Sequence, residues 1–328
     1  MHGHVFARTV AAAAALAPEL DRQWQAVRDL VPGCRDVPVD VWIVSELAAA
    51  QSGANLSDAE AFAIRDPPRV VVLEHDDEQS HSLAHELVHV LTDDAWRRLP
   101  AFVEEGLADH VATRLAPSSS RMTDLISMLP RLPGIRLRLT GRVGQEELNC
   151  TLQFDDAPMD AASLRDVLAQ TSTHSTTDYV DRAADYSAGF LIVSLIVERE
   201  GLGRLRALCD EAGSRGQPLV PPEALLDAAQ LPPEPGAWAP IVASMFGDDD
   251  LHVVARRFAH IIAGALVAMR PASADELAAA LSGGMVELGL GNARVRLDQV
   301  PAVLEALPAE LARATERGAP APGSAAGG

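Results

Sequence analysis

Apolar residues recur at two spacings along this chain, and the spacing separates the helices we expect from the strands. Over residues 6–30 the apolar positions follow the helical period, and Leu20, Trp24 and Val27 continue one face. Short apolar runs at residues 39–44 (VDVWIV) and 69–74 (RVVVLE) are bounded by prolines or polar turns, as strands usually are. The pattern predicts a helix and then two strands.

Helical periodicity dominates the rest of the chain. One helix is expected after the acidic residues 76–78, because carboxylates stabilise a helix N-terminus, and the next is expected to start at Pro100 and run to about residue 115. Residues 116–180 show no clear period. Helical patterns return over residues 185–210, beyond residue 250 and over 299–316, with a hairpin expected around Gly289 to Asn292. We therefore expect an α+β fold that is predominantly helical.

Proline-rich stretches suggest how the chain divides. The stretches at residues 218–222 and 232–240 are typical of linkers, and a Pro/Ala/Gly-rich tail ends the sequence. We expect one domain over residues 1–235, a helical C-terminal region of unknown role over 236–316, and a disordered tail over 317–328.

Composition excludes several kinds of function. The 328 residues include no lysine, so a phosphate-loop lysine and Schiff-base chemistry are both excluded. The net charge is −19 and no arginine cluster forms a basic stripe, which argues against a nucleic-acid partner. The three cysteines are widely spaced and indicate neither a disulfide framework nor a cysteine metal site. No convincing signal peptide or membrane span is visible, so a cytoplasmic location and no membrane partner are expected.

The segment HELVH, residues 85–89, is the main candidate for chemistry. Residues four apart on a helix project from nearly the same face, so His85 and His89 could bind one zinc ion together. Glu86 would then lie at the flank of the metal, where a carboxylate can take a proton from a metal-bound water. The competing interpretation is an ordinary amphipathic helix that happens to contain two histidines.

The next expected helix contains EEGLAD, residues 104–109, and favours the metal interpretation. A catalytic zinc site needs a third protein ligand and an open fourth position, and Glu105 could supply the ligand. Asp109, four residues later on the same face, could bond the other ring nitrogen of a zinc-bound histidine. Gly106 costs helix stability, and a close approach of this helix to the HELVH helix around a metal would explain its presence.

HELVH followed by LPAFVEEGLAD resembles the gluzincins, the thermolysin-like and peptidase-MA-like zinc metallopeptidases. The resemblance implies a zincin-like domain with a small mixed sheet packed on the HELVH helix. It also implies that Glu105, and not Glu104, is the third zinc ligand. The strand over residues 69–74 resembles the substrate-binding edge strand of that family.

A downstream segment, DYSAGFLIVSLIVEREGLGRLRAL, is also similar to a helix of the peptidase-MA-like branch. The resemblance implies that Tyr186 stabilises the oxyanion of the tetrahedral intermediate. His174 and Tyr179, in a polar segment nearby, remain alternative donors. His75, His81 and His110 also flank the zinc motif, and we expect none of them to be a ligand.

The resemblance implies a hydrolase that cleaves peptide bonds with one Zn²⁺ per chain and Glu86 as the base. No anchor for a substrate amino terminus is recognisable, which favours endopeptidase action on a peptide or protein. Two alternatives remain, a non-catalytic zinc-binding protein and a peptidase-like scaffold for a function of the C-terminal region. Glu86 argues against the first, because a site that only binds zinc needs no carboxylate at its flank. The oligomeric state does not follow from the sequence.

Overall fold

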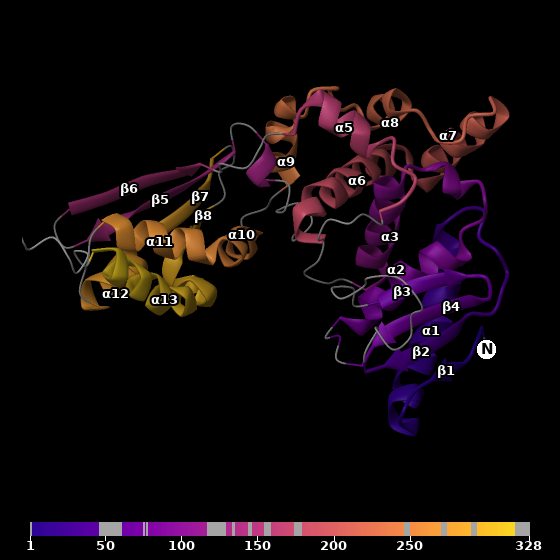
Figure 1. Ribbon diagram of the computed structural model, residues 1–328, viewed down its shortest axis with the longest axis horizontal. Helices are drawn as coiled ribbons and strands as arrows, with labels where there is room; N and C mark the ends of the chain where they lie inside the picture. The colour runs from indigo at the N-terminus through magenta and orange to yellow at the C-terminus, as the bar shows by residue number, and fades with distance from the viewer. Residues whose placement is uncertain are drawn as a thin grey trace, which may run out of the picture. The chain divides into compact units, whose positions relative to one another are not determined.

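The computed structural model describes residues 2–45, 61–74, 76, 78–116, 129–132, 135–143, 146–153, 159–173, 179–245, 250–269, 274–289 and 294–318. They form two compact units (Figure 1). The first comprises Met1–Met128 and Met159–Pro235, and the second comprises Leu129–Pro158 and Gly236–Gly328. Each unit combines helices with a four-stranded sheet, so the fold is α+β and predominantly helical, as the apolar pattern predicts.

The sheet of the first unit is mixed and has the strand order β1-β2-β4-β3. Its strands are β1 (Val5–Phe6), β2 (Asp40–Val44), β3 (Ala61–Arg65) and β4 (Pro68–Leu73). β2 pairs in parallel with both β1 and β4, whereas β3 pairs with β4 in the antiparallel sense. The start of the chain, expected to be helical from residue 6, therefore first adds a short strand to the sheet.

The edge strand differs from the one that the sequence suggested. β4, the strand that precedes the HELVH helix, lies between β2 and β3 and is not at the edge. The physical reason is that β3 turns back through residues 66–67 and pairs with β4 along its whole length. Among the described strands of this sheet, β3 is the edge strand next to β4.

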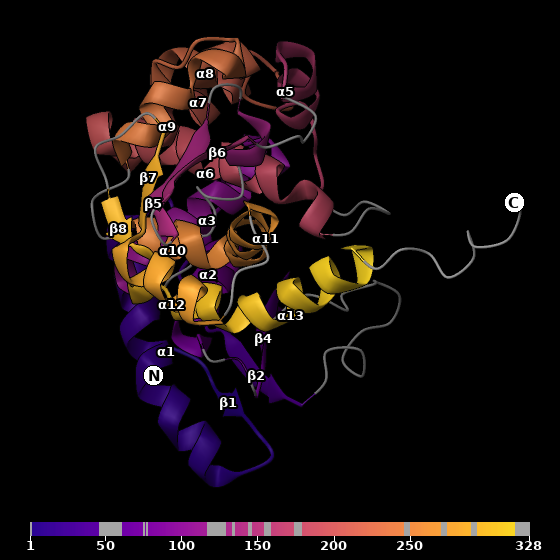
Figure 2. The same cartoon turned by 90° about the vertical axis from the view of Figure 1, so that its left-hand side faces the viewer.

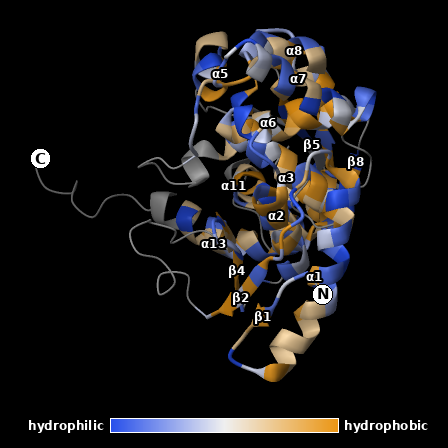
Figure 3. Ribbon diagram, turned by 90° about the vertical axis from the view of Figure 1, so that its right-hand side faces the viewer, coloured by the Kyte–Doolittle hydropathy of each residue, from blue (hydrophilic) through white to orange (hydrophobic). Residues whose placement is uncertain are grey.

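One face of this sheet packs against helices. Alternate side chains of β2 and β4 are buried on that face: Val41, Ile43, Val70 and Val72. Figure 3 colours much of β2, β4 and α2 as hydrophobic. α1 (Val10–Leu30) and α2 (Gln79–Leu91) contact each other, and α2 also contacts β3 and β4. The apolar core of the unit thus lies between the sheet and these helices, one of which contains HELVH.

Further helices complete the first unit. η2 (Trp96–Arg98) leads from α2 into α3 (Ala101–Leu115), and α3 packs against α2 and α6. Pro100 is the N-cap of α3 rather than its first residue. The periodic stretch that was expected from residue 185 forms two helices. The later helices are α5 (Ala161–Val167), α6 (Tyr179–Glu200), α7 (Leu202–Ser214) and α8 (Pro222–Ala229).

The second unit has an antiparallel sheet in the order β6-β5-β7-β8 (Figure 2). Its strands are β5 (Arg136–Val143), β6 (Glu146–Gln153), β7 (Met285–Leu288) and β8 (Arg294–Arg296). The expected hairpin is present as β7 and β8, which pair with each other. Its helices are α9 (Ala239–Met245), α10 (Leu251–Arg257), α11 (Ala259–Met269), α12 (Ala274–Gly283) and α13 (Pro301–Gly318).

The unit boundaries differ from the contiguous domain expected over residues 1–235. Residues 129–158 belong to the second unit because β5 pairs with β7 from the C-terminal part of the chain. That C-terminal part is consequently not purely helical. The tail expected to be disordered begins within the end of α13, and residues 319–328 lie outside the described residues. In the described part of the chain, no helix is both long and apolar enough to cross a membrane.

Candidate metal centre

α2 presents two faces with different chemistry. Leu83, Leu87 and Leu91 are fully buried on the core side of the helix. His85 and His89 lie on the other side, and their side chains keep exposed fractions of only 17% and 15%. The apolar face therefore fixes the helix against the sheet and leaves both imidazoles facing α3.

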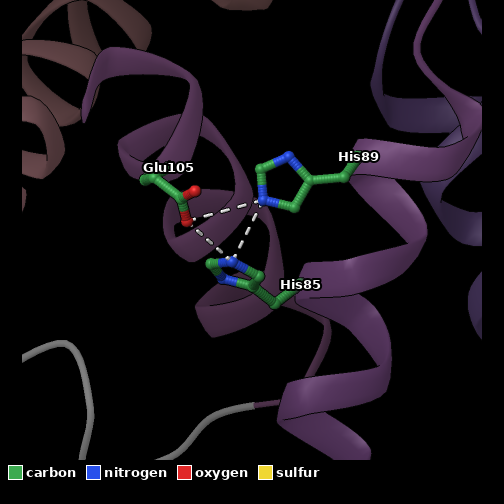
Figure 4. Close-up of side chains that lie close together, drawn as sticks. All are labelled: His85, His89 and Glu105. Atoms are coloured by element: carbon green, nitrogen blue, oxygen red, sulfur yellow. Dashed lines mark hydrogen bonds and ion pairs between the residues drawn. The ribbon is translucent and has the colours of Figure 1, made fainter. Parts of the chain in front are cut away.

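Three side chains from α2 and α3 converge on one point (Figure 4). His85 Nε2 lies 3.2 Å from His89 Nε2 and 3.2 Å from Glu105 Oε2. The distance from His89 Nε2 to Glu105 Oε2 is 3.5 Å. The two residues expected as histidine ligands and the residue expected as third ligand are thus brought together.

Each imidazole also donates a hydrogen bond from its other ring nitrogen, Nδ1, to a carboxylate. The Nδ1–H of His85 donates to Asp109 Oδ1 at 2.6 Å, and the Nδ1–H of His89 donates to Glu104 Oε1 at 3.3 Å. A proton held at Nδ1 leaves the lone pair of Nε2 available to a cation. Asp109 occupies the position that the sequence suggested for it.

Glu104 is a functional candidate that the sequence reasoning did not identify. The resemblance implies only that Glu104 is not a ligand, and its Oε1 accepts a hydrogen bond from Nδ1 of His89 and is not part of the converging group. The signal that could have found it is the pair of adjacent glutamates on a helix facing two histidines. One glutamate of such a pair can be a ligand while the other orients a ligand.

The charges in the cluster influence one another strongly. Burial opposes the charged form of His89, but Glu105 and Glu104 outweigh burial and raise the pKa of His89 to about 10. Burial likewise opposes charge on His85, yet Asp109 and Glu105 hold its pKa well above the usual range. Burial alone would raise the pKa of Glu105, but the two histidines keep that pKa far below its ordinary value. The site therefore favours a positive charge between its carboxylates.

Glu86 lies beside the cluster on α2 and is 9% exposed. Burial raises the pKa of its carboxyl group, and the positive charges of His85 and His89 partly offset this effect. Glu86 does not belong to the group of converging ligand atoms. Its place is thus at the flank of the cluster, next to His85 in the chain.

Tyr186 lies on α6, which crosses α3 close to Glu105. A Cβ added to Gly106 would lie 2.3 Å from the carbonyl carbon of Gly189, so the two helix backbones touch at this crossing. The ring of Tyr186 meets the ring of Phe102 edge-on, with 4.9 Å between centroids. Its role as oxyanion donor stays a prediction. His174 and the side chain of Tyr179 lie outside the described residues.

Two of the neighbouring histidines have partners elsewhere. Nδ1 of His81 lies 3.1 Å from the carbonyl oxygen of Ala116, and Nδ1 of His110 lies 3.2 Å from Ser194 Oγ. Neither belongs to the converging group, and His75 lies outside the described residues.

Comparison with known proteins gives no independent identification. No family model matches the chain, and neither a curated protein nor a solved structure matches it. A functional assignment therefore depends on the residues and geometry of the site itself.

Proposed function

We propose that the first unit is a zincin-like catalytic domain that hydrolyses peptide bonds with one zinc ion. His85, His89 and Glu105 would hold the ion, as in the gluzincins that the motif resembles. The observation that carries the proposal is the convergence of Nε2, Nε2 and Oε2 from these three residues within 4.8 Å of one another.

The distances within the cluster suit this metal. Two ligand atoms at about 2.0–2.1 Å from a tetrahedral zinc ion lie about 3.3 Å apart. The three separations here are 3.2, 3.2 and 3.5 Å. Imidazole nitrogen and carboxylate oxygen are also common zinc ligands. The four nearby carboxylates of Glu86, Glu104, Glu105 and Asp109 further supply negative charge that a divalent cation would neutralise.

Bound zinc would supply a Lewis acid that lowers the pKa of a water molecule towards 7 and polarises a carbonyl group. Glu86 accepts the proton of the attacking water and later delivers it to the leaving nitrogen. Its buried position one residue after His85 suits this role, because it flanks the ligand group without belonging to it. Asp109 and Glu104 keep the imidazole rings oriented throughout the reaction.

The edge strand β3 offers a place for the substrate. An extended peptide can pair with the open edge of a sheet through main-chain hydrogen bonds, and pockets for alternate side chains then determine specificity. β3 has one neighbour among the described strands, β4, and it contacts the metal-bearing helix α2. A peptide that pairs with β3 would run beside this helix, which favours cleavage within a chain and hence endopeptidase action.

Cleavage of a mixed peptide library by the zinc-loaded protein tests the proposal. Glu86→Gln should keep bound zinc and lose cleavage by at least about 100-fold, since the proton acceptor is removed. Glu105→Ala should lose zinc and cleavage together. Glu223→Gln, which changes an exposed glutamate of α8, is the matched control and should behave as wild type.

Full cleavage by Glu86→Gln would contradict the proposal. A wild-type protein that binds zinc tightly and cleaves no peptide in the library would instead favour a non-catalytic zinc-binding protein.

A further inference from the structure

The C-terminal end of α2 is bound by two arginines from distant parts of the chain. The last carbonyl groups of any helix lack partners within the helix, and its last turn frays unless other groups bond them. His89 lies in the last turn of α2, whereas His85 lies one turn further inside. Whatever fixes this end of the helix consequently affects His89 more than His85.

Arg35 donates hydrogen bonds to two of these terminal carbonyl groups. Its guanidinium donates to the carbonyl oxygen of Val90, and its backbone N–H donates to the carbonyl oxygen of Leu91 at 2.6 Å. The acceptors belong to Val90 and Leu91, the two residues that follow His89 in the chain. The last turn of α2 is thus tied to the segment that leads into β2.

Arg65 donates hydrogen bonds to Thr92, the residue that ends the helix. Its guanidinium donates to the carbonyl oxygen of Thr92 and, at 2.8 Å, to Thr92 Oγ1. Thr92 is the C-cap of α2 and is 1% exposed, so water has little access to these acceptors. Arg65 is also the last residue of β3, and its side chain thereby connects the edge strand to the end of the metal-bearing helix.

The charge of these two side chains suits their position. Cations stabilise the negative end of the helix dipole at a C-terminus. Burial lowers the pKa of Arg65, and the charge of Glu104 is the largest effect that opposes this shift. Glu104 is the carboxylate that accepts the Nδ1–H of His89. The hydrogen bonds of Arg65 therefore act on the end of the helix that contains this histidine.

We propose that Arg35 and Arg65, here called the arginine clamp, are positioning residues of the metal centre. By fixing the carbonyl end of α2, the clamp holds His89 Nε2 at the point where it meets His85 Nε2 and Glu105 Oε2. The clamp does not belong to the converging ligand group and acts through the end of α2. This inference rests on the proposed metal function of the site.

The test measures Co²⁺ affinity by competition with a chelator, together with the visible spectrum of bound Co²⁺ and the melting temperature of the chelator-treated protein. Arg65→Met removes the donors and the charge but keeps the apolar stem, and it should weaken Co²⁺ binding about 10-fold and alter the spectrum. Arg65→Lys keeps the charge and should recover part of the affinity. Thr92→Val removes only the Oγ1 acceptor and should show a smaller loss in the same direction.

Arg97→Met is the matched control. Arg97 lies between α2 and α3, is 55% exposed, and pairs with Asp94 rather than with α2. Its replacement should leave both Co²⁺ affinity and spectrum unchanged. If Arg65→Met does not fold, Arg65→Lys and Thr92→Val still test the proposal through the same measurements.

Two results would contradict the positioning role of the arginine clamp while leaving the proposed function intact. One is an unchanged Co²⁺ affinity in the folded Arg65 and Thr92 variants. The other is a lowered melting temperature with unchanged affinity and spectrum, because that result would show a purely structural role. A wild-type protein that binds no Co²⁺ would overturn the proposed function itself, and the clamp with it.

Discussion

At the scale of single residues, the orientation of each imidazole matters as much as its presence. Asp109 and Glu104 hold the Nδ1 protons of His85 and His89, so that both Nε2 atoms face Glu105. Asp109 could be predicted because it stands four residues after Glu105 on one helix. Glu104 was missed, because its contact with His89 depends on how α2 and α3 pack, and the only hint in the sequence is the pair of adjacent glutamates.

Removing the charge of either orienting carboxylate should weaken metal binding. Asp109→Asn and Glu104→Gln keep size and hydrogen-bonding capacity but lose the negative charge, and we expect zinc affinity to fall about 10–100-fold. Asp109→Asn should have the larger effect, because its contact to His85 is 2.6 Å whereas Glu104 lies 3.3 Å from His89. Titration of the chelator-treated protein with zinc measures both losses.

Asp94→Asn provides the control for these two variants, since the side chain of Asp94 is 91% exposed. Its zinc affinity should equal that of the wild type. Equal affinities in all three variants would show that Asp109 and Glu104 do not support the site.

At the scale of elements, the close crossing of α3 and α6 places Glu105 next to the helix that contains Tyr186. The helical period predicted both helices. Gly106 was expected to let α3 approach the HELVH helix α2 closely, but its close neighbour is Gly189 of α6, and this contact depends on tertiary packing that no local pattern shows. β3 was missed for a similar reason. AFAIR is a short apolar run without clear alternation, and its pairing with β4 is what makes it a strand.

The crossing predicts that Gly189→Ala is strongly destabilising. A Cβ at this position would lie 1.8 Å from the carbonyl oxygen of Phe102, so the two helices would have to separate. Overpacking of this kind typically costs about 1–3 kcal/mol in the free energy of unfolding. Denaturant unfolding measures the loss.

Gly203→Ala in α7 is the control, because a Cβ there meets nothing within 4 Å. Alanine is a better helix former than glycine, so this variant should be neutral or slightly stabilised. A Gly189→Ala protein as stable as Gly203→Ala would contradict the close crossing.

At the scale of the whole molecule, the chain leaves the first unit, forms β5 and β6 in the second, and then returns. The pairing of Leu137 with Leu288 and of Leu139 with Val286 joins residues about 150 positions apart in the sequence. No local pattern reports such a pairing, and for this reason the sequence predicted a contiguous domain over residues 1–235.

All the converging ligand residues, by contrast, lie within a span of 21 residues, from 85 to 105. Their proximity could be inferred from two neighbouring helices.

A chain ended after Pro235 should expose apolar surface. It would lack β7, and Leu137 and Leu139, both 0% exposed in the full chain, would lose the strand that pairs with β5. Unpaired apolar strand edges promote aggregation. We expect greater binding of a hydrophobic dye and concentration-dependent association in light scattering. A shortened chain that associates no more than the full chain and binds no more dye would contradict the division into units.

X-ray absorption at the zinc edge of the purified, zinc-loaded chain tests the metal site most directly. A site formed by His85, His89 and Glu105 should give one zinc per chain with nitrogen and oxygen ligands at about 2.0–2.1 Å and two imidazole rings. Glu105→Ala should lose the metal or show a changed ligand set. A chain that retains no zinc, or a zinc environment identical in the wild type and in both His85→Ala and Glu105→Ala, would show that these residues do not form a zinc site.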